Sequence, residues 1–299
     1  MKKLTKPNSG TLHIICEVFH CTEGQIANIE LLKKGMTNHS FTFDINGEKF
    51  IIRVPGEGTD RLINRHEEAV SFSAIKGTKI CDDPVYLNPE NGIKITRFLD
   101  GVRTCDPFNQ TDLINCMDKL ASFHEMKLTV PHQFDLFGKI DFYEDLWNGK
   151  PSIYKDYAET KERVFGLIPF INSCEKQWCL THVDAVPDNF LIYQTDNGEA
   201  IQLTDWEYAG MQDPHLDIAM FCIYSMYQKE DCDHLIDLYF KGNCDLTTRT
   251  KIYCYIAASG LLWSNWCEYK RQLGIEFGEY SFRQYQYAKD FYQYALERI

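Results

Sequence analysis

A histidine, an acid and an amide lie close together just past the middle of the chain. His182 and Asp184 are separated by one residue, and four residues separate Asp184 from Asn189, which opens an apolar run. A carboxylate in such a loop can accept or orient a hydroxyl proton, and an amide a few residues further on can bind a metal ion. This spacing is typical of phosphoryl transfer, although a chance match on a polar loop is an alternative for the segment alone.

A second acidic segment follows at a spacing that fits the same chemistry. Asp205 comes at the end of the apolar stretch 201–203, sixteen residues beyond Asn189, and Glu207 is two residues further on. An acid at the end of such a strand can be a second metal ligand, and the metal ion can bridge the phosphates of a nucleotide. Two solvated acids capping the next segment are the alternative. The order of Asp184, Asn189 and Asp205 favours the metal-ligand interpretation.

A nucleotide site is expected in the N-terminal region, although neither a P-loop motif nor a full dinucleotide fingerprint occurs. The loop Gly35, Met36, Thr37 and Asn38 combines a glycine, which allows close backbone approach, with side chains that can donate to phosphate oxygens.

A strand cation is the second nucleotide-binding candidate of this region. Arg53 lies on the third predicted strand, and the following helix carries Glu67 and Glu68. A strand cation paired with a helix glutamate aligns phosphates in kinases. An exposed strand arginine is the alternative.

The elements that must position these residues divide the chain into a sheet-rich region, 1–98, and a mostly helical region, 99–299. Asn46-Gly47 between two β-rich runs predicts a hairpin, and Asn91-Gly92 predicts a second strand pair. One helix is expected in the first region, over 61–76, with Asp60 as its N-cap. Helical periodicity extends over 110–126, 214–228, 247–270 and 281–297. No linker separates independent domains.

Composition narrows the choice of ligand and compartment. The formal net charge of -12 argues against nucleic acid or an anionic membrane surface and favours a small cationic ligand. The 12 cysteines are scattered without a metal-binding pattern, so we expect free, mostly buried thiols and a reducing cytoplasm. No signal peptide and no membrane-spanning segment are predicted.

Four motifs in order resemble the choline/ethanolamine kinases, especially the bacterial choline kinases of phosphocholine decoration. They are Gly-Met-Thr-Asn at 35–38, Asn-Arg-His-Glu-Glu at 64–68, the loop 182–189, and Thr-Asp-Trp-Glu-Tyr at 204–208 with Asp213, Pro214 and Asp217 beyond it. The sequence departs from the family's usual residues at Lys34 and at Pro187-Asp188.

The resemblance implies a two-lobed α+β fold of the protein-kinase-like type shared with aminoglycoside phosphotransferases. It also implies ATP and Mg²⁺ as cofactors. Asp184 would be the catalytic base, His182 would fix its loop, and Asn189, Asp205 and Glu207 would bind magnesium. The nucleotide would be bound by Gly35, Met36, Thr37, Asn38, Arg53 and Glu68, with Thr96, Phe98 and Leu99 in the hinge beside adenine.

Two tryptophans at helical spacing suggest how the acceptor is bound. Trp263 and Trp266 share a helix face, and a quaternary ammonium, which has no N–H, is bound by cation–π contacts. From the spacing alone, two core tryptophans are the commoner case; the same pair in bacterial choline kinases favours the acceptor site. Further candidates for binding the acceptor are Tyr208, Tyr227, Tyr280, Asp184 and Glu207.

The expected reaction is transfer of the γ-phosphate of ATP to the hydroxyl of choline, giving phosphocholine. A sister kinase acting on ethanolamine, an aminoglycoside or thiamine remains an alternative, as does an inactive kinase-like binding protein. The small-molecule substrate, choline, is the expected partner, and the sequence does not reveal the oligomeric state.

Overall fold

The computed structural model describes residues 7–34, 38–56, 59–81, 83–196 and 198–299. The chain forms two compact units. The first comprises residues 1–103 together with Leu191–Tyr208, and the second comprises Thr104–Phe190 and Ala209–Ile299. The sequence suggested one boundary near residue 98, whereas the chain returns to the first unit after Phe190.

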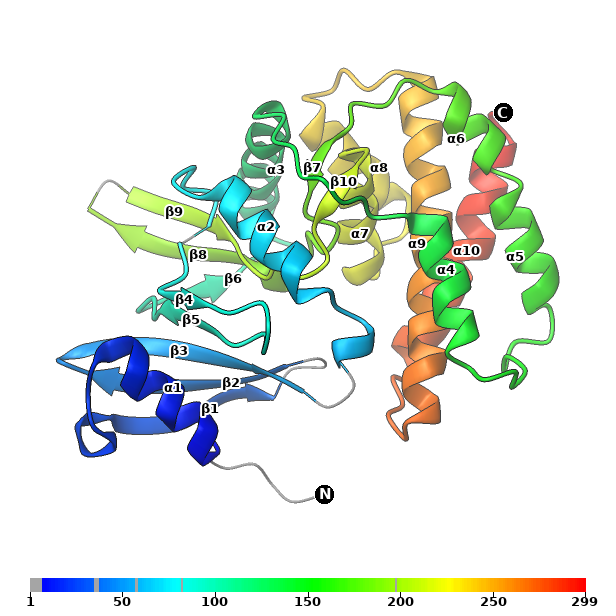
Figure 1. Ribbon diagram of the computed structural model, residues 1–299. Helices are drawn as coiled ribbons and strands as arrows, with labels where there is room; N and C mark the ends of the chain where they lie inside the picture. Colours follow the sequence, from blue (N-terminus) through cyan, green and yellow to red (C-terminus); the bar gives the residue numbers. More distant parts are fainter. Residues whose placement is uncertain (1–6, 35–37, 57–58, 82, 197) are drawn as a thin grey trace. The chain divides into compact units, whose positions relative to one another are not determined.

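A five-stranded antiparallel sheet with the order β1-β2-β3-β5-β4 forms the centre of the first unit (Figure 1). The β2–β3 turn has positive φ at both Asn46 (53°) and Gly47 (81°), the backbone of a two-residue hairpin, so the predicted hairpin is confirmed. The second predicted pair, β4 with β5, is confirmed as well. The strands are β1 (Ala27–Lys34), β2 (Asn38–Ile45), β3 (Glu48–Pro55), β4 (Tyr86–Leu87) and β5 (Lys94–Arg97).

Two helices, not one, accompany this sheet. Helix α1 (Ser9–Phe19) begins at Asn8, whose side chain accepts a hydrogen bond from the Thr11 amide. Its Ile15 is fully buried in a core formed with the aromatic and aliphatic side chains of β2, β3 and β5. The expectation of a single helix was therefore wrong: α1 also packs Leu12, Val18 and Phe19 against this core.

Helix α2 (Arg65–Ile75) starts four residues later than predicted. Asn64 caps it, because its side chain accepts hydrogen bonds from the His66 and Glu67 amides. A 3-10 turn, η2 (Thr59–Arg61), ends where the predicted helix was expected to begin, and residues 62–64 are not helical. The later start places Glu68, rather than Glu67, on the buried face of α2.

A second, three-stranded sheet has the order β6-β8-β9. Strand β6 (Arg103–Thr104) lies at one edge of this sheet. Strands β8 (Phe190–Thr195) and β9 (Gly198–Leu203) are neighbours in the sheet, and β9 directly precedes the acidic segment. Leu203 donates its amide to the Ile80 carbonyl at 2.8 Å, which anchors the end of β9 within the first unit. The segment 204–208 starts directly from this anchored strand.

The second unit is mainly helical, with one small sheet, β7 (Cys179–Thr181) paired to β10 (Gly210–Gln212). In Figure 1 its two long helices, α9 and α10, lie side by side. The four predicted helical stretches are confirmed as α3, α7, α9 and α10, whereas four shorter helices were not predicted. Its helices are α3 (Gln110–Glu125), α4 (Leu136–Asp145), α5 (Tyr157–Phe165), α6 (Ile168–Ser173), α7 (His215–Tyr224), α8 (Lys229–Tyr239), α9 (Leu246–Gln272) and α10 (Glu279–Leu296).

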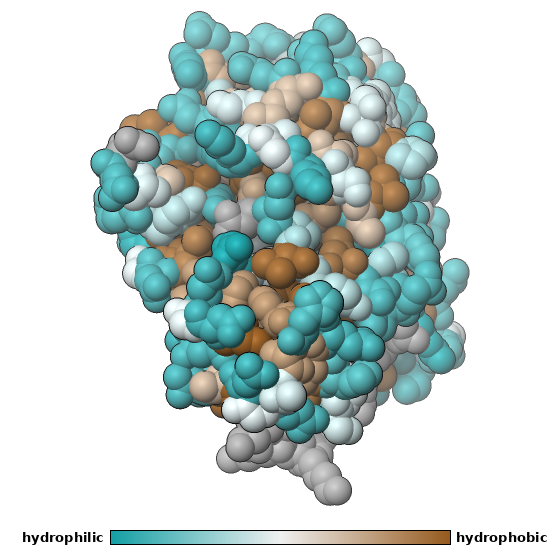
Figure 2. Space-filling view, turned by 60° about the vertical axis from the view of Figure 1, so that its left-hand side comes forward, coloured by the Kyte–Doolittle hydropathy of each residue, from teal (hydrophilic) through white to brown (hydrophobic). Residues whose placement is uncertain are grey.

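The surface hydropathy and the state of the cysteines both match what the composition predicts: a largely hydrophilic surface and free, mostly buried thiols. Figure 2 shows a face on which hydrophilic residues predominate and hydrophobic ones form small separate patches. All 12 cysteines fall within the described ranges and are free, and most of them are buried, as predicted. Among the described residues, no helix combines the length and hydrophobicity required to cross a bilayer.

Candidate active site

A buried ion pair links β3 to α2 in the first unit. Arg53 donates from Nη1 to Glu68 Oε1 at 2.5 Å and from Nη2 to Glu68 Oε2 at 2.8 Å. Both residues are almost fully buried. Nη2 also donates to the Gly92 carbonyl at 3.2 Å, and a Cβ at position 92 would collide with Pro55 and Arg65. The strand-to-helix pair predicted from the sequence is confirmed, and Gly92 lets its surroundings close on it.

A second guanidinium extends this pair to the acidic segment after β9. Arg65 donates from Nη1 to Glu68 Oε2 at 2.9 Å and to Glu207 Oε2 at 3.0 Å. Asn38 donates from Nδ2 to the same Glu207 oxygen at 2.8 Å and accepts from Arg65 at 3.0 Å. Glu207 is thus clamped by two side chains, and the sequence did not predict the contribution of Arg65.

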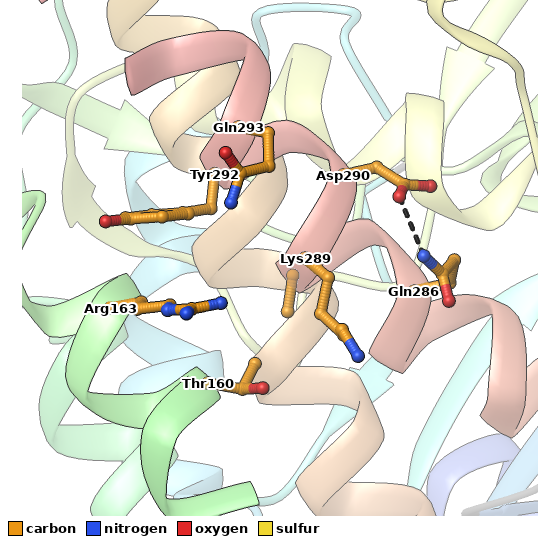
Figure 3. Close-up of a pocket in the computed structure, with 8 residues that line it drawn as sticks. Thr160, Arg163, Gln286, Lys289, Asp290, Tyr292 and Gln293 are labelled. Carbon is orange, nitrogen blue, oxygen red and sulfur yellow. Dashed lines mark hydrogen bonds between the residues drawn. The ribbon is translucent and has the colours of Figure 1, made fainter. Parts of the chain in front are cut away.

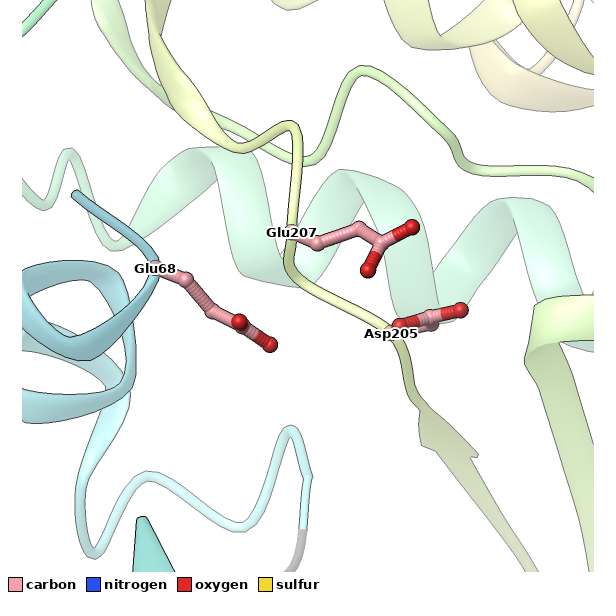
Figure 4. Close-up of side chains that lie close together, drawn as sticks. All are labelled: Glu68, Asp205 and Glu207. Carbon is pink, nitrogen blue, oxygen red and sulfur yellow. The ribbon is translucent and has the colours of Figure 1, made fainter. Parts of the chain in front are cut away.

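Asp205 is the carboxylate of this group with the greatest freedom to bind a ligand. Its side chain is 33% exposed, and its Oδ1 lies 3.5 Å from Arg53 Nη1. Its backbone has a φ of 69°, a left-handed conformation that is uncommon for residues other than glycine. Oxygens of Glu68, Asp205 and Glu207 lie within 4.8 Å of one another (Figure 4). An oxygen-only donor set of this kind suits Mg²⁺.

The charges of the cluster influence each other strongly. Burial alone raises the pKa of Glu68, but the opposing Arg53 guanidinium and its hydrogen bonds lower it to about 2. Burial and the neighbouring Asp205 raise the pKa of Glu207 against the pull of Arg53 and Arg65. Lys94 is also buried here, with its ammonium 4.6 Å from the centre of the Phe72 ring, and burial and Arg53 lower its pKa. Three cations therefore offset three carboxylates in this cluster.

The remaining nucleotide candidates are only partly described. Gly35, Met36 and Thr37 lie outside the described residues. In the predicted hinge, Thr96 pairs with Ile51 across β5 and β3, and Phe98 donates its amide to the Lys49 carbonyl at 2.9 Å. Leu99 follows, half-buried. Their contact with adenine stays a prediction.

In the second unit, the loop after β7 brings Asp184 and Asn189 together. Asn189 donates from Nδ2 to the Asp184 carbonyl at 2.8 Å and to Asp184 Oδ2 at 3.1 Å. Val183, directly before Asp184, has a φ of 69°. A β-branched residue in this conformation is strained, so the rest of the structure must impose it.

Asp217 on α7 imposes the shape of this loop. It accepts the His182 amide at 3.0 Å and the Val183 amide at 2.6 Å, one on each carboxylate oxygen. His124 lies 3.0 Å from Asp217 Oδ2 through Nε2. The fully buried His182 therefore lies in a loop that is fixed through its backbone. No role for Asp217 beyond its place in the motif was predicted from the sequence.

We expect Asp217→Asn to lower kcat on the order of 100-fold while the KM for ATP changes little. The amide can accept only one of the two backbone N–H groups well, so the strained Val183 can relax and shift Asp184. Steady-state kinetics at saturating ATP measure this effect. A wild-type kcat would show that the loop keeps its shape without the Asp217 carboxylate.

Aromatic side chains from α7, α9 and α10 form a continuous group in the second unit. Trp263 and Trp266 meet edge to face at 5.5 Å between ring centres, and Trp266 lies 5.1 Å from Phe277. Tyr280 lies 6.4 Å from Phe277 and 6.3 Å from Tyr224. We call these five residues the aromatic group.

The two tryptophans of the aromatic group differ in exposure. Trp266 is 1% exposed, and the Lys270 ammonium lies 5.2 Å from its ring centre, whereas Trp263 is half-buried. Burial, with smaller contributions from Cys267 and Asp184, raises the pKa of Tyr280. The sequence did not single out Tyr224 or Phe277.

Two predicted acceptor-site tyrosines have other surroundings. Tyr227 is buried, bonds through its hydroxyl to the Pro107 carbonyl, and packs against Phe108 and Phe221. These contacts give Tyr227 a structural role. Tyr208 is half-buried and belongs to the first unit.

A shallow hollow of about 180 Å³ lies between α5 and α10 (Figure 3). Its charged residues are used within the protein: Arg163 pairs with Glu159, and Lys289 pairs with Asp156. Gln286 donates to Asp290 within the same wall. The hollow is therefore a weaker candidate for the functional site than the carboxylate cluster of the first unit or the Asp184 loop and aromatic group of the second.

Comparison with known proteins identifies the family. Residues 29–239 match the choline/ethanolamine kinase family. Protein LicA of Haemophilus influenzae is 27% identical over 267 residues, which cover 83% of this chain and 95% of that protein. Choline kinase LicA from Streptococcus pneumoniae has 26% identity and a TM-score of 0.80, covering 96% of this chain and 100% of that one. The structure of LicA in complex with AMP matches with 26% identity and a TM-score of 0.77, over 96% of this chain and 100% of that one.

These matches confirm the kinase-like α+β fold predicted from the motifs. This chain belongs to the choline/ethanolamine kinase family.

Proposed function

We propose that this protein is a choline kinase, which transfers the γ-phosphate of ATP to the choline hydroxyl and releases phosphocholine and ADP. The observation that carries the proposal is the hydrogen bond of 2.8 Å that Tyr224 of the aromatic group donates to Asp188, which lies in the same loop as Asp184. A general base beside aromatic faces suits an alcohol that carries a quaternary ammonium. The likeness to choline kinase LicA supports this substrate. Because ATP is the donor and the thiols are free, we place the reaction in the cytoplasm.

The catalytic roles follow from the geometry of each segment. Asp184 orients the acceptor hydroxyl and accepts its proton, and Asn189 fixes the Asp184 side chain. We propose Asp205 and Asn189 as magnesium ligands, with Glu207 in support because it is already clamped by Arg65 and Asn38. Magnesium, when bound, neutralises the charge that develops on the transferred phosphoryl group.

The nucleotide phosphates are proposed to meet Arg53, which Glu68 keeps in one orientation through two hydrogen bonds. A guanidinium held in this way loses little conformational freedom when it binds phosphate. The loop 35–38 and the hinge 96–99 complete the proposed ATP site. LicA in complex with AMP supports nucleotide binding by this fold.

A side-by-side assay of acceptors tests the substrate. We expect choline to have at least a tenfold higher kcat/KM than ethanolamine or kanamycin in an ADP-release assay with ATP and Mg²⁺. The reason is that a primary ammonium requires hydrogen-bond acceptors, which the tryptophan and phenylalanine rings of the aromatic group do not supply.

The other outcomes of this assay are equally informative. A preference for ethanolamine, an aminoglycoside or thiamine would keep the kinase mechanism and contradict choline as the substrate. ATP binding without turnover of any acceptor would favour an inactive binding protein. If Asp205→Asn lowers turnover strongly but leaves the acceptor preference of the remaining activity unchanged, metal binding is separated from acceptor choice.

A further inference from the structure

Asp188 is the one acidic residue of the Asp184 loop to which the proposed mechanism gives no role. It lies in the 3-10 turn η3 (Pro187–Asn189) and is half-buried. Its Oδ2 accepts a hydrogen bond of 2.8 Å from the Tyr224 hydroxyl on α7. The carboxylate is therefore held in a defined orientation beside the catalytic loop.

Tyr224 connects this carboxylate to the aromatic group. Its ring lies 6.3 Å from Tyr280 at an interplanar angle of 70°, and Tyr280 is followed by Phe277 and the two tryptophans. Burial and the Asp188 and Asp184 carboxylates raise the pKa of Tyr224, so its hydroxyl stays protonated at neutral pH and continues to donate. The negative charge of Asp188 thus stands at one end of a row of aromatic faces.

We propose that Asp188, oriented by Tyr224, is the residue that makes the acceptor site selective for a cation over a neutral alcohol of the same shape. This inference rests on the proposed function. A quaternary ammonium cannot donate a hydrogen bond, so a carboxylate attracts it through charge alone, over several ångströms. The donated hydrogen bond also polarises the Tyr224 phenol, which strengthens the attraction of its ring for a cation.

The test compares choline with 3,3-dimethyl-1-butanol, which has the same shape and no charge. Asp188→Asn keeps the side-chain volume and an oxygen for the Tyr224 hydroxyl but removes the charge. We expect the KM for choline to rise about tenfold, while the inhibition constant of 3,3-dimethyl-1-butanol against choline changes less than about twofold. The kcat at saturating choline and the KM for ATP should stay near wild type, because Asp184 and Asn189 are unaltered.

Asp156→Asn is the matched control, since Asp156 also accepts a 2.8 Å hydrogen bond from a tyrosine, Tyr285, and the charge change is the same. It should leave both constants unchanged. An unchanged choline KM in Asp188→Asn would overturn the proposal, and so would equal weakening of choline and the neutral alcohol, which would show a purely structural role.

A second variant keeps the proposal testable if Asp188→Asn does not fold. Tyr224→Phe retains the ring and removes the hydrogen bond that orients the Asp188 carboxylate, so we expect the choline KM to rise about threefold with no change for the neutral alcohol. No difference between the two compounds in this variant would count against Asp188. A wild-type enzyme that does not use choline would instead contradict the proposed function, which is a separate result.

Discussion

Asp184→Asn is expected to lower kcat by about 10² to 10⁴-fold while ATP binding remains near the wild-type level. The amide cannot accept a proton from the choline hydroxyl, but it can still accept the hydrogen bond that Asn189 donates to the side chain. The loop should therefore keep its shape and lose only its base. Single-turnover ADP release measures the chemical step, and calorimetry with ATP measures binding.

Asp196→Asn supplies the control, because Asp196 is an exposed acid in the β8–β9 turn and its loss changes the net charge equally. Its kcat should equal that of the wild type. If Asp184→Asn also turned over at the wild-type rate, Asp184 would not be the base. A parallel loss of ATP binding would instead indicate a collapsed loop.

The parts of this protein that the sequence predicts well depend on local signals. The Asn46-Gly47 turn requires positive φ at two successive residues, and few other dipeptides allow it. The pairing of Arg53 with Glu68 was predicted because a strand cation paired with a glutamate of the following helix aligns phosphates in kinases. Long helices such as α9 carry enough periodicity to be recognised, whereas short ones such as α6 do not.

Contacts that link distant segments could not be predicted in the same way. The clamp on Glu207 joins residues 142 and 169 positions away, Arg65 and Asn38, and no local pattern encodes it. The left-handed backbone of Val183 and Asp205 opposes the intrinsic preference of both residues and exists only because surrounding structure imposes it.

The tryptophan pair shows a further limit. Helical spacing correctly placed Trp263 and Trp266 on one face of α9, but it gives no measure of depth. In the structure Trp266 is 1% exposed, with Lys270 over its ring. Trp266 therefore supports the half-buried Trp263, and Trp263 and Tyr280 are the better candidates for direct contact with a cation.

The second large effect is expected on stability, from Glu68→Gln. The pKa of Glu68 falls from an ordinary value of 4.5 to about 2 in the folded protein. A depressed carboxylate pKa contributes stability above the unfolded value, and this contribution is lost as the pH falls from about 4.5 toward 2. The substitution should lower the free energy of unfolding by about 3 kcal/mol at pH 7 and by clearly less at pH 3.

Urea unfolding between pH 7 and pH 3 measures this effect, with Glu67→Gln as the control on the same helical turn. Glu67 is not on the buried face of α2, so its variant should follow the wild-type pH dependence. An equal loss of stability at both ends of this pH range would show that packing, rather than charge, carries the effect.

The same ion pair also orients Arg53, whose guanidinium donates to both oxygens of Glu68. A glutamine at position 68 would offer only one acceptor oxygen. The KM for ATP should therefore rise about tenfold in Glu68→Gln, whereas loss of stability with unchanged ATP affinity would confine the ion pair to a structural role.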